Sequence, residues 1–434
     1  MKKLYSKNIS FVILVLAMTF LFGCQDSDNG KENEFIYWSS NNSNEIDYAR
    51  QIVKKWNDSH ADYFVKHQPV PEGQSSEEVI LASVVGGTTP DIYSNMWEGD
   101  VEAYAQAGVL IPLDTLAGFM EFLYARCDSS AIEEVRSQNG HIYQIPWKIN
   151  PIMLIYNKNH LAAINLDSPP RTYSEFMEAG KRFKKDLDGD GYIDQWFGYS
   201  EVLVTWWQRF FDFYPLYLAA SGGAPLIKDN KANFNNKYAV EVFRFLRELY
   251  RNNYFPRERL SARQDPFLSG VIAIRFTGPW EIAHAEQYKP EGFEYDFTSM
   301  PVPDSSDSIP YTYCDPKNTV IFNTCKNPQA AWEFLKYSMT EENDLLFLEV
   351  TNQLPRRSDL LENVNFDSYF ERNPMMRTFA KQAKHVRGTD QTPVLKEVFD
   401  LISQEYEACV IYDRKSPEQA IEDAAKAVNL LFLD

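Results

Sequence analysis

Short apolar strands alternate with helix-like segments near the start of this chain, and this alternation restricts the possible folds more than any single motif does. Strand-like stretches occur at 34–38 (EFIYW), 63–67 (YFVKH) and 90–96 (PDIYSNM), and segments with helical spacing separate them. Asn42 and Glu45 have the spacing of a reciprocal helix cap before the first of these helices. Strands that alternate with helices favour a parallel sheet with helices on its faces. The alternation therefore predicts an α/β fold.

A second series of strands and helices begins near residue 152. Its strand-like stretches are 152–157 (IMLIYN), 270–276 (GVIAIRF) and 319–323 (TVIFN), and helical patterns cover 173–187, 206–223, 237–255 and 327–339. A chain of 434 residues is too long for one compact core. The sequence therefore predicts two α/β domains.

The first 24 residues have the pattern of an export signal. Lys2, Lys3 and Lys7 precede an apolar run at 11–22, which is too short for a permanent membrane span. The run closes with LFGC, which resembles the lipobox of bacterial lipoproteins. We expect a signal peptide at 1–23, acylation of Cys24 and a flexible tether at 24–33, so that the chain is a membrane-anchored lipoprotein of the cell envelope that faces the periplasm or the exterior. Phe22 is bulky for this motif, which leaves a secreted form without an anchor as the alternative.

The net charge and the aromatic content restrict the possible partners. The formal net charge is −18, and we expect neither nucleic acid nor anionic lipid to be bound through the overall field. Aromatic residues make up 15% of the chain, which suits a surface that stacks on sugars. The internal cysteines have no CxxC spacing, so either one disulfide, with Cys314 and Cys325 the nearest pair, or ordinary buried thiols is expected.

No local motif indicates catalysis. The sequence has no HExxH, GxSxG, P-loop or GxGxxG pattern, and its six histidines are scattered. A pair of carboxylates for glycoside hydrolysis could be drawn from 61 acidic residues, but no local pattern singles one out. We expect a protein that is not an enzyme.

The stretch DLDGDGYID at 186–194 has the pattern of a calcium loop. Oxygen ligands at loop positions 1, 3, 5, 7 and 9 and a glycine at position 6 are typical of such loops. The expected ligands are Asp186, Asp188, Asp190, the backbone of Tyr192, and Asp194. Position 12 is Phe197, where a sensor loop has Glu, so a calcium ion here would be structural. A solvated acidic turn is the alternative.

Five segments in fixed order carry a family resemblance: 86–113, 143–158, 186–198, 273–280 and 327–342. Together they resemble the family 1 extracellular solute-binding proteins, the maltose-binding-protein-like sugar-binding components of ABC importers. The resemblance implies a two-lobed periplasmic-binding-protein type II fold with a hinge and a ligand cleft between the lobes. Carried onto this chain, lobe 1 is 34–148 plus about 314–370, and lobe 2 is 149–313 plus about 371–434.

The resemblance also implies which residues face the ligand. The expected ligand-binding residues are Trp38, Ser39, Asn41, Trp97, Glu98, Trp147, Lys148, Asn150, Gly278 and Trp280. Flat aromatic rings cover the CH faces of sugars, while amides and carboxylates pair with hydroxyl groups. Of the tandem Trp206 and Trp207, we expect one in the core and the other at the cleft edge. Gln353 stands where the family often has glycine. Arg356 is expected in a surface or interlobe ion pair, and a clamp on the ligand is the alternative.

These observations predict a monomeric, lipid-anchored receptor that captures a carbohydrate, an oligosaccharide for preference, and delivers it to an ABC transporter permease by lobe closure. Structural Ca²⁺ is the only cofactor expected. The alternative is a cell-surface glycan-binding or glycan-processing lipoprotein outside the ABC import class.

Overall fold

The computed structural model describes residues 33–72, 75–183, 185–260, 265–306 and 309–433. The predicted signal peptide, Cys24 and all of the tether except Asn33 lie outside the described residues. Among the helices that are described, none is both long and apolar enough to cross a membrane.

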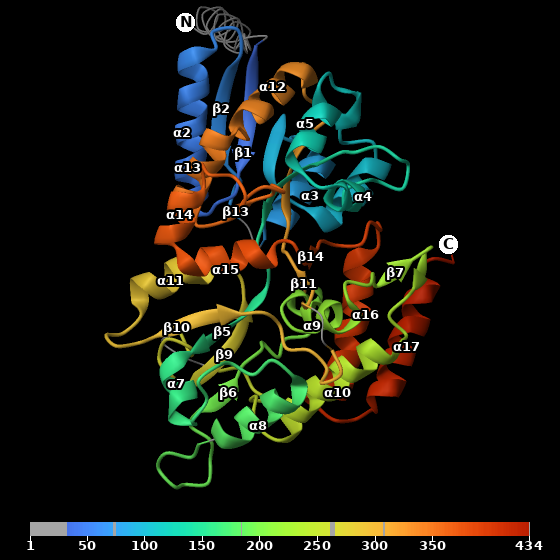
Figure 1. The fold of residues 1–434 in the computed structure, drawn as a ribbon. Coiled ribbons are helices and arrows are strands. Elements are labelled where there is room, and N and C mark those ends of the chain that lie inside the picture. Colours follow the sequence, from blue (N-terminus) through green and yellow to red (C-terminus); the bar gives the residue numbers. More distant parts are fainter. Residues whose placement is uncertain (1–32, 73–74, 184, 261–264, 307–308, 434) are drawn as a thin grey trace, which may run out of the picture.

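The first lobe is built on a six-stranded sheet with the order β13-β4-β12-β3-β1-β2 (Figure 1). Its strands are β1 (Glu34–Ser39), β2 (Phe64–Pro69), β3 (Ile92–Trp97), β4 (Ile145–Ile149), β12 (Lys317–Ile321) and β13 (Leu354–Pro355). Its helices are α2 (Ser43–Ser59), α3 (Ser76–Gly86), α4 (Glu98–Gln106), η1 (Leu113–Thr115), α5 (Phe119–Arg126), α6 (Ser129–Glu134), α12 (Pro328–Ser338) and α13 (Glu341–Thr351). Strands β1, β2 and β3 are parallel, as predicted, whereas β12 runs antiparallel to both β3 and β4.

The second lobe has a four-stranded sheet with the order β10-β5-β9-β6. Its strands are β5 (Met153–Asn157), β6 (Trp196–Gly198), β9 (Ile272–Thr277) and β10 (Tyr295–Thr298), with a small hairpin of β7 (Ile227–Lys228) and β8 (Lys231–Ala232) nearby. Its helices are α7 (Lys158–Ala163), α8 (Tyr173–Phe183), η2 (Trp206–Phe210), α9 (Phe213–Ser221), α10 (Lys237–Arg251), α11 (Trp280–Tyr288), α16 (Leu395–Tyr406), η3 (Glu407–Ile411) and α17 (Pro417–Leu430).

Alternation of side chains explains how the first sheet buries both faces. Phe35 and Tyr37 of β1 join the apolar cluster that contains α2 and α12, while Trp38 packs on the opposite face with Tyr93. All six residues of β3 are buried, because both faces of this central strand are covered. The core of the second lobe is a larger cluster formed around α9, α10, α16 and α17.

The predicted cap of α2 is half correct. The side chain of Asn42 accepts hydrogen bonds from the backbone N–H groups of Asn44 and Glu45, as an N-cap does. The carboxylate of Glu45 does not complete a reciprocal cap, because it is buried in an ion pair with Lys148.

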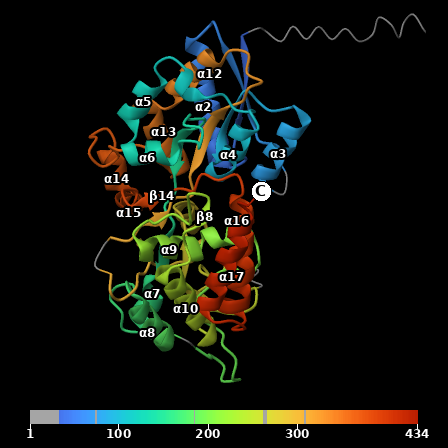
Figure 2. The same ribbon diagram turned by 90° about the vertical axis from the view of Figure 1, so that its right-hand side faces the viewer.

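Three chain segments cross between the lobes side by side. In the first, between β4 and β5, the N–H of Asn150 donates to the carbonyl of Cys314 at 2.6 Å. The second contains β11 (Thr312–Tyr313), which pairs in parallel with β14 (Val386–Arg387) of the third. The helices α14 (Asp367–Arg372) and α15 (Pro374–Gln382) lie between the two sheets (Figure 1). Figure 2 shows the same division into two lobes from the side.

The four cysteines that the structure describes, Cys127, Cys314, Cys325 and Cys409, are free and buried. The expectation of ordinary buried thiols is therefore correct, and Cys314 and Cys325 do not form a disulfide.

Candidate ligand-binding cleft

A cavity of about 690 Å³ lies between the two lobes. This volume falls within the range of about 300 to 1,000 Å³ that is usual for small-molecule sites. The lining residues are Ser75, Glu77, Glu78, Leu81, Trp97 and Lys317 of the first lobe, Trp206, Trp207, Phe210, Phe211 and Lys396 of the second, and Tyr313 and Asp315 of a crossing segment.

Trp97 is the central aromatic residue of this cavity. It ends β3 in the first lobe, yet its indole packs among the core residues of the second lobe and is only 3% exposed. Its ring centroid lies 4.9 Å from that of Trp206 and 5.6 Å from that of Phe210. Its Nε1 donates a hydrogen bond of 3.2 Å to the hydroxyl of Tyr313. Trp97 therefore joins both lobes and a crossing segment at one point of the cavity wall.

A second group of rings extends this wall toward solvent. Trp207 is 42% exposed and lies 6.5 Å from Phe211 between ring centroids. Phe211 in turn meets Trp280 edge to face at 6.2 Å. Trp206 and Trp207 both line the cavity, and Trp206 also packs against the apolar core of the second lobe, as expected for one of the two. Exposed rings on one wall of a cavity are suited to covering the apolar face of a ligand.

Gly278 is required by the position of Trp280. The indole of Trp280 folds back over the preceding turn, and a Cβ on Gly278 would lie 2.6 Å from its Cε3 atom. A Cβ on Gly99 would likewise meet the ring of Trp97, 2.6 Å from Cζ2. At both positions the absence of a side chain allows an aromatic ring to lie close to the backbone. Neither has a positive φ.

The two lysines that line the cavity are each paired with a carboxylate. Lys317 lies 3.0 Å from Glu77, and Lys396 lies 2.6 Å from Asp100. Burial opposes the ionisation of Glu77, but the neighbouring Lys317 outweighs this and lowers its pKa to about 2. Burial raises the pKa of Asp315, against the influence of Lys317 and Lys148.

The residues predicted after β1 do not line the cavity. Trp38 is half-buried and donates from Nε1 to Gln68 at 3.3 Å. Ser39 is buried, and its hydroxyl lies 2.8 Å from Nε2 of His67. Asn41 is exposed at the start of the loop before α2.

The residues predicted in β4 and after it are internal to the first lobe. Trp147 is 3% exposed and packs against Phe347 at 5.0 Å between ring centroids. Lys148 is buried 2.5 Å from Glu45. The side chain of Gln353 accepts from Asn150 at 3.0 Å and donates to Glu45 at 2.8 Å. Strand β4 is covered on both faces, so these side chains hold the lobe together and do not face the cavity in this conformation.

Glu98 points toward the third crossing segment instead of into the cavity. It is 2% exposed and accepts a hydrogen bond of 3.0 Å from the side chain of Gln391. Burial, followed by the nearby carboxylate of Glu134, raises its pKa well above the ordinary value.

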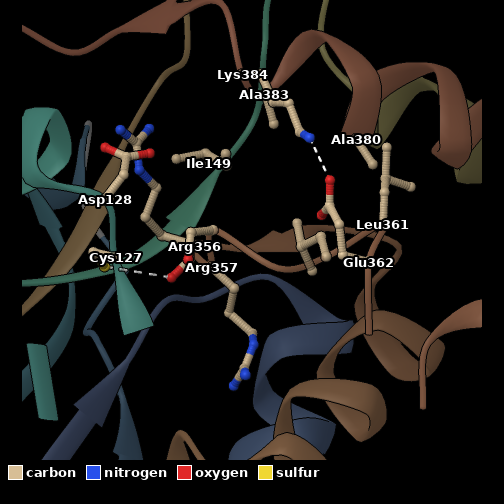
Figure 3. Close-up of a pocket in the computed structure, with 12 residues that line it drawn as sticks. Cys127, Asp128, Ile149, Arg356, Arg357, Leu361, Glu362, Ala380, Ala383 and Lys384 are labelled. Carbon is tan, nitrogen blue, oxygen red and sulfur yellow. Dashed lines mark hydrogen bonds and ion pairs between the residues drawn. The ribbon is translucent and has the colours of Figure 1, made fainter. Parts of the chain in front are cut away.

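Arg356 lies at a different place, in a small pocket of about 30 Å³ beside the crossing segments (Figure 3). Its guanidinium pairs with Glu134 at 3.4 Å, and Figure 3 shows it directed toward Asp128, away from Arg357. An ion pair is formed, as predicted, but it is largely buried within the first lobe and lies neither at the surface nor between the lobes.

The predicted calcium loop connects α8 to β6 at the end of the second lobe that lies away from the first lobe (Figure 1). Asp186, Asp188 and Asp194 each offer an oxygen atom within 4.8 Å of the others. Asp190 is not part of this group; its carboxylate accepts the backbone N–H of Tyr192 at 2.8 Å. The acidic donors fit a hard cation, and the loop is remote from the aromatic wall.

Sequence reasoning missed most of the cavity wall. Phe210, Phe211, Tyr313, Lys317 and Lys396 line it without having been singled out. The run WWQRFF at 206–211 is the available signal, because four of its six residues are aromatic.

Two α/β lobes, three crossing segments and an aromatic cavity between the lobes define a two-lobed binding protein. Residues 51–378 match the model of the bacterial extracellular solute-binding proteins, and the chain belongs to this family. The predicted family and two-lobed fold are thereby confirmed.

Similar proteins extend over most of the chain. The maltotriose-binding protein of Pyrococcus abyssi is 21% identical, over 86% of this chain and 77% of its own. The sn-glycerol-3-phosphate-binding periplasmic protein UgpB of Yersinia enterocolitica is also 21% identical, over 92% of each chain. The solved structure of an uncharacterized protein from Listeria monocytogenes is 27% identical and superimposes with a TM-score of 0.79, over 92% of this chain and 100% of that one.

Proposed function

We propose that this protein captures a carbohydrate, for preference an oligosaccharide, in the cavity between its lobes and delivers it to the permease of an ABC transporter. The observation that carries the proposal is the aromatic wall formed by Trp97, Trp206, Trp207 and Phe211 in a cavity of about 690 Å³. The similarity to a maltotriose-binding protein supports the same ligand class.

Capture works through lobe closure. The cavity has walls from both lobes, so a ligand that touches both stabilises the closed arrangement by its differential affinity for it. The three crossing segments form the hinge about which the lobes turn. Hydrogen bonds between neighbouring crossings, such as Ile152 N to Tyr313 O at 2.8 Å, keep the hinge together.

The charges of the cavity favour a neutral saccharide over an anionic one. Glu77, Glu78 and Asp315 line the cavity, and each of its two lysines already has a carboxylate partner. A phosphate or uronate would have to displace one of these carboxylates and would meet the remaining ones. The ligand class named for UgpB, a sugar-alcohol phosphate, is therefore disfavoured here.

We propose binding without catalysis. An acid of the glycoside hydrolase type needs a raised pKa, so that it carries a proton near neutral pH. The cavity acids do not decide the question, because the pKa of Glu77 is lowered to about 2 beside Lys317 while burial raises that of Asp315. The proposal of binding is supported by the family that the chain matches, which consists of solute-binding proteins.

A thermal-shift screen tests the proposed ligand class. Maltotriose, other neutral mono- and oligosaccharides and sn-glycerol 3-phosphate are added to the chain from residue 25 onward. A ligand at a hundredfold excess over its Kd stabilises the folded state by about 2.7 kcal/mol. We expect at least one neutral oligosaccharide to raise the melting temperature. A shift with sn-glycerol 3-phosphate alone would overturn the proposal of a neutral sugar.

The same function places the protein outside the cytoplasm, and we propose that Cys24 carries the lipid anchor. In a Cys24→Ser variant the protein is expected to leave the membrane fraction or to keep its signal peptide. A variant that is fully processed and still bound to membranes would contradict the anchor.

A structural Ca²⁺ ion in the loop 186–194 is a further proposal. Asp186, Asp188 and Asp194 would supply carboxylate oxygens, and the ion would fix the loop between α8 and β6. The distance from the cavity makes a direct role in ligand binding unnecessary.

A further inference from the structure

The ion pair between Asp100 and Lys396 bridges the two lobes beside the aromatic wall. Asp100 lies in the first turn of α4 in the first lobe, and Lys396 lies in the first turn of α16 in the second. Their charged atoms are 2.6 Å apart, with side chains 12% and 34% exposed. A pair of this kind depends directly on how close the lobes are.

The position of Lys396 is not explained by the stability of its own helix. A cation near a helix N-terminus is disfavoured by the helix dipole, whereas an anion there, such as Asp100 in α4, is favoured. The ammonium of Lys396 is instead placed 5.6 Å from the ring centroid of Trp97 and 5.4 Å from that of Trp206. Lys396 therefore has partners in both lobes, namely Asp100 and Trp97 in the first and Trp206 in the second.

The contact leaves room for a ligand. With the two lobes joined by this pair, the cavity still measures about 690 Å³, and Lys396 is one of its lining residues. The joined arrangement is therefore not a collapsed state that excludes the ligand. The apparent affinity for a ligand is reduced when only a fraction of the protein is in the ligand-competent state. A protein that already populates its closed, competent state therefore binds more tightly.

We infer that Asp100 and Lys396 form an interlobe clasp, which stabilises the closed, ligand-competent arrangement and positions the Trp97 and Trp206 rings. Lys396 is thus a positioning residue of the cleft. Only the effect of the clasp on saccharide affinity rests on the proposed function. The effect of the clasp on lobe closure can be measured without any ligand.

The first test is a measurement of lobe closure without a saccharide. Small-angle X-ray scattering of the parent, Asp100→Asn, Lys396→Met and the double variant is expected to give a larger radius of gyration for all three variants. Lys426→Met is the matched control, because Lys426 pairs with Glu422 inside one helix, α17. An unchanged radius of gyration in Lys396→Met overturns the clasp. If Lys396→Met does not fold, Lys396→Gln and a salt titration of the parent give the same readout.

The second test is a double-mutant cycle on affinity. Titration calorimetry with the best saccharide from the screen is expected to give a Kd weakened about threefold to tenfold by each single change, with no further loss in the double variant. Additive losses with an unchanged radius of gyration would make Lys396 a ligand contact and overturn the clasp. A parent that binds no saccharide refutes the proposed function, while scattering still decides on the clasp.

Discussion

Trp97 and Trp207 line the same cavity but have different roles: Trp97 packs in the interior, and Trp207 presents an exposed ring. Trp97 is buried among second-lobe residues, so its replacement would disturb packing as well as the cavity. Trp207 is 42% exposed and contributes little to the core. The free ring face of Trp207 makes it the cleaner probe of ligand contact.

Trp207→Ala is therefore expected to weaken saccharide binding by about tenfold to a hundredfold, on the order of 1 to 3 kcal/mol for a covered aromatic ring. Its free energy of unfolding should change by less than about 1 kcal/mol, because the side chain is not part of the core. Calorimetric titration and urea melts measure the two quantities. Tyr288→Ala, at an exposed ring on α11 outside the cavity, is the control. Equal affinities of the Trp207 variant and the parent would remove this ring from the site.

Glu77 gives the cavity a pH-dependent contribution to stability. Its pKa is lowered from 4.5 to about 2, so the contribution is fully present above pH 4.5 and is lost as the pH falls through 2. On acidification the parent should lose about 2 to 3 kcal/mol of unfolding free energy through the protonation of Glu77. Glu77→Gln should not show this part of the loss. Urea melts from pH 6 to pH 2 measure it, with Glu78→Gln, an exposed neighbour, as the control. Parallel profiles of the parent and Glu77→Gln would refute the assignment.

At the residue scale, the local pattern can place an aromatic ring near the cavity without establishing its contact with a ligand. Trp97 and Trp280 were predicted at the cleft; Trp97 lines the cavity, and Trp280 touches the lining ring of Phe211. Trp147 was expected there too, but it turns into the core because β4 is covered on both faces. Lys396 could not be found, because its partner Asp100 is distant in sequence and belongs to the other lobe.

At the scale of elements, the segment 206–223 illustrates what periodicity can and cannot predict. The pattern predicts one helix, whereas the chain forms the five-residue η2 and then, after a break at Phe211 and Asp212, the helix α9. The buried side chain of Asp212 accepts a hydrogen bond from the N–H of Phe213 and pairs with Arg209 at 3.1 Å. That break turns the WWQRFF rings toward the cavity, and it depends on a buried ion pair that hydrophobic periodicity does not register.

The loop between α8 and β6 gives a prediction about an element. Asp186→Ala combined with Asp188→Ala is expected to abolish the rise in melting temperature that calcium gives the parent, because two of the three converging carboxylates are removed. Saccharide affinity should be unchanged, because the loop lies far from the cavity. Differential scanning calorimetry with calcium and with a chelator measures the effect. A parent whose melting temperature does not respond to chelation would leave the acidic turn as the correct interpretation.

At the scale of the whole molecule, the third crossing segment fits closely against the first lobe. Gly388 follows β14, and a Cβ added to it would lie 2.9 Å from Cδ of Glu98, with the carboxylate oxygen nearer still. Glu98 cannot swing aside freely, because it is buried and bonded to Gln391. The backbone of Gly388 does not have a positive φ, so the constraint at this glycine is the contact between the crossing segment and the first lobe, and not local strain.

Gly388→Ala should consequently press the first lobe away from the crossing segment. We expect a loss of about 1 to 3 kcal/mol in unfolding free energy, as for overpacking of a well-packed contact, together with weaker saccharide binding. Urea melts and calorimetric titration measure both effects. The shorter side chain in Glu98→Ala removes the opposing carboxylate, so adding Gly388→Ala to that variant should cost less than adding it to the parent. Gly388→Ala could instead lower the unfolding free energy equally in the parent and in Glu98→Ala. The added methyl group would then contact some other part of the molecule, and the close fit between Glu98 and Gly388 would not determine how the crossing segment packs on the first lobe.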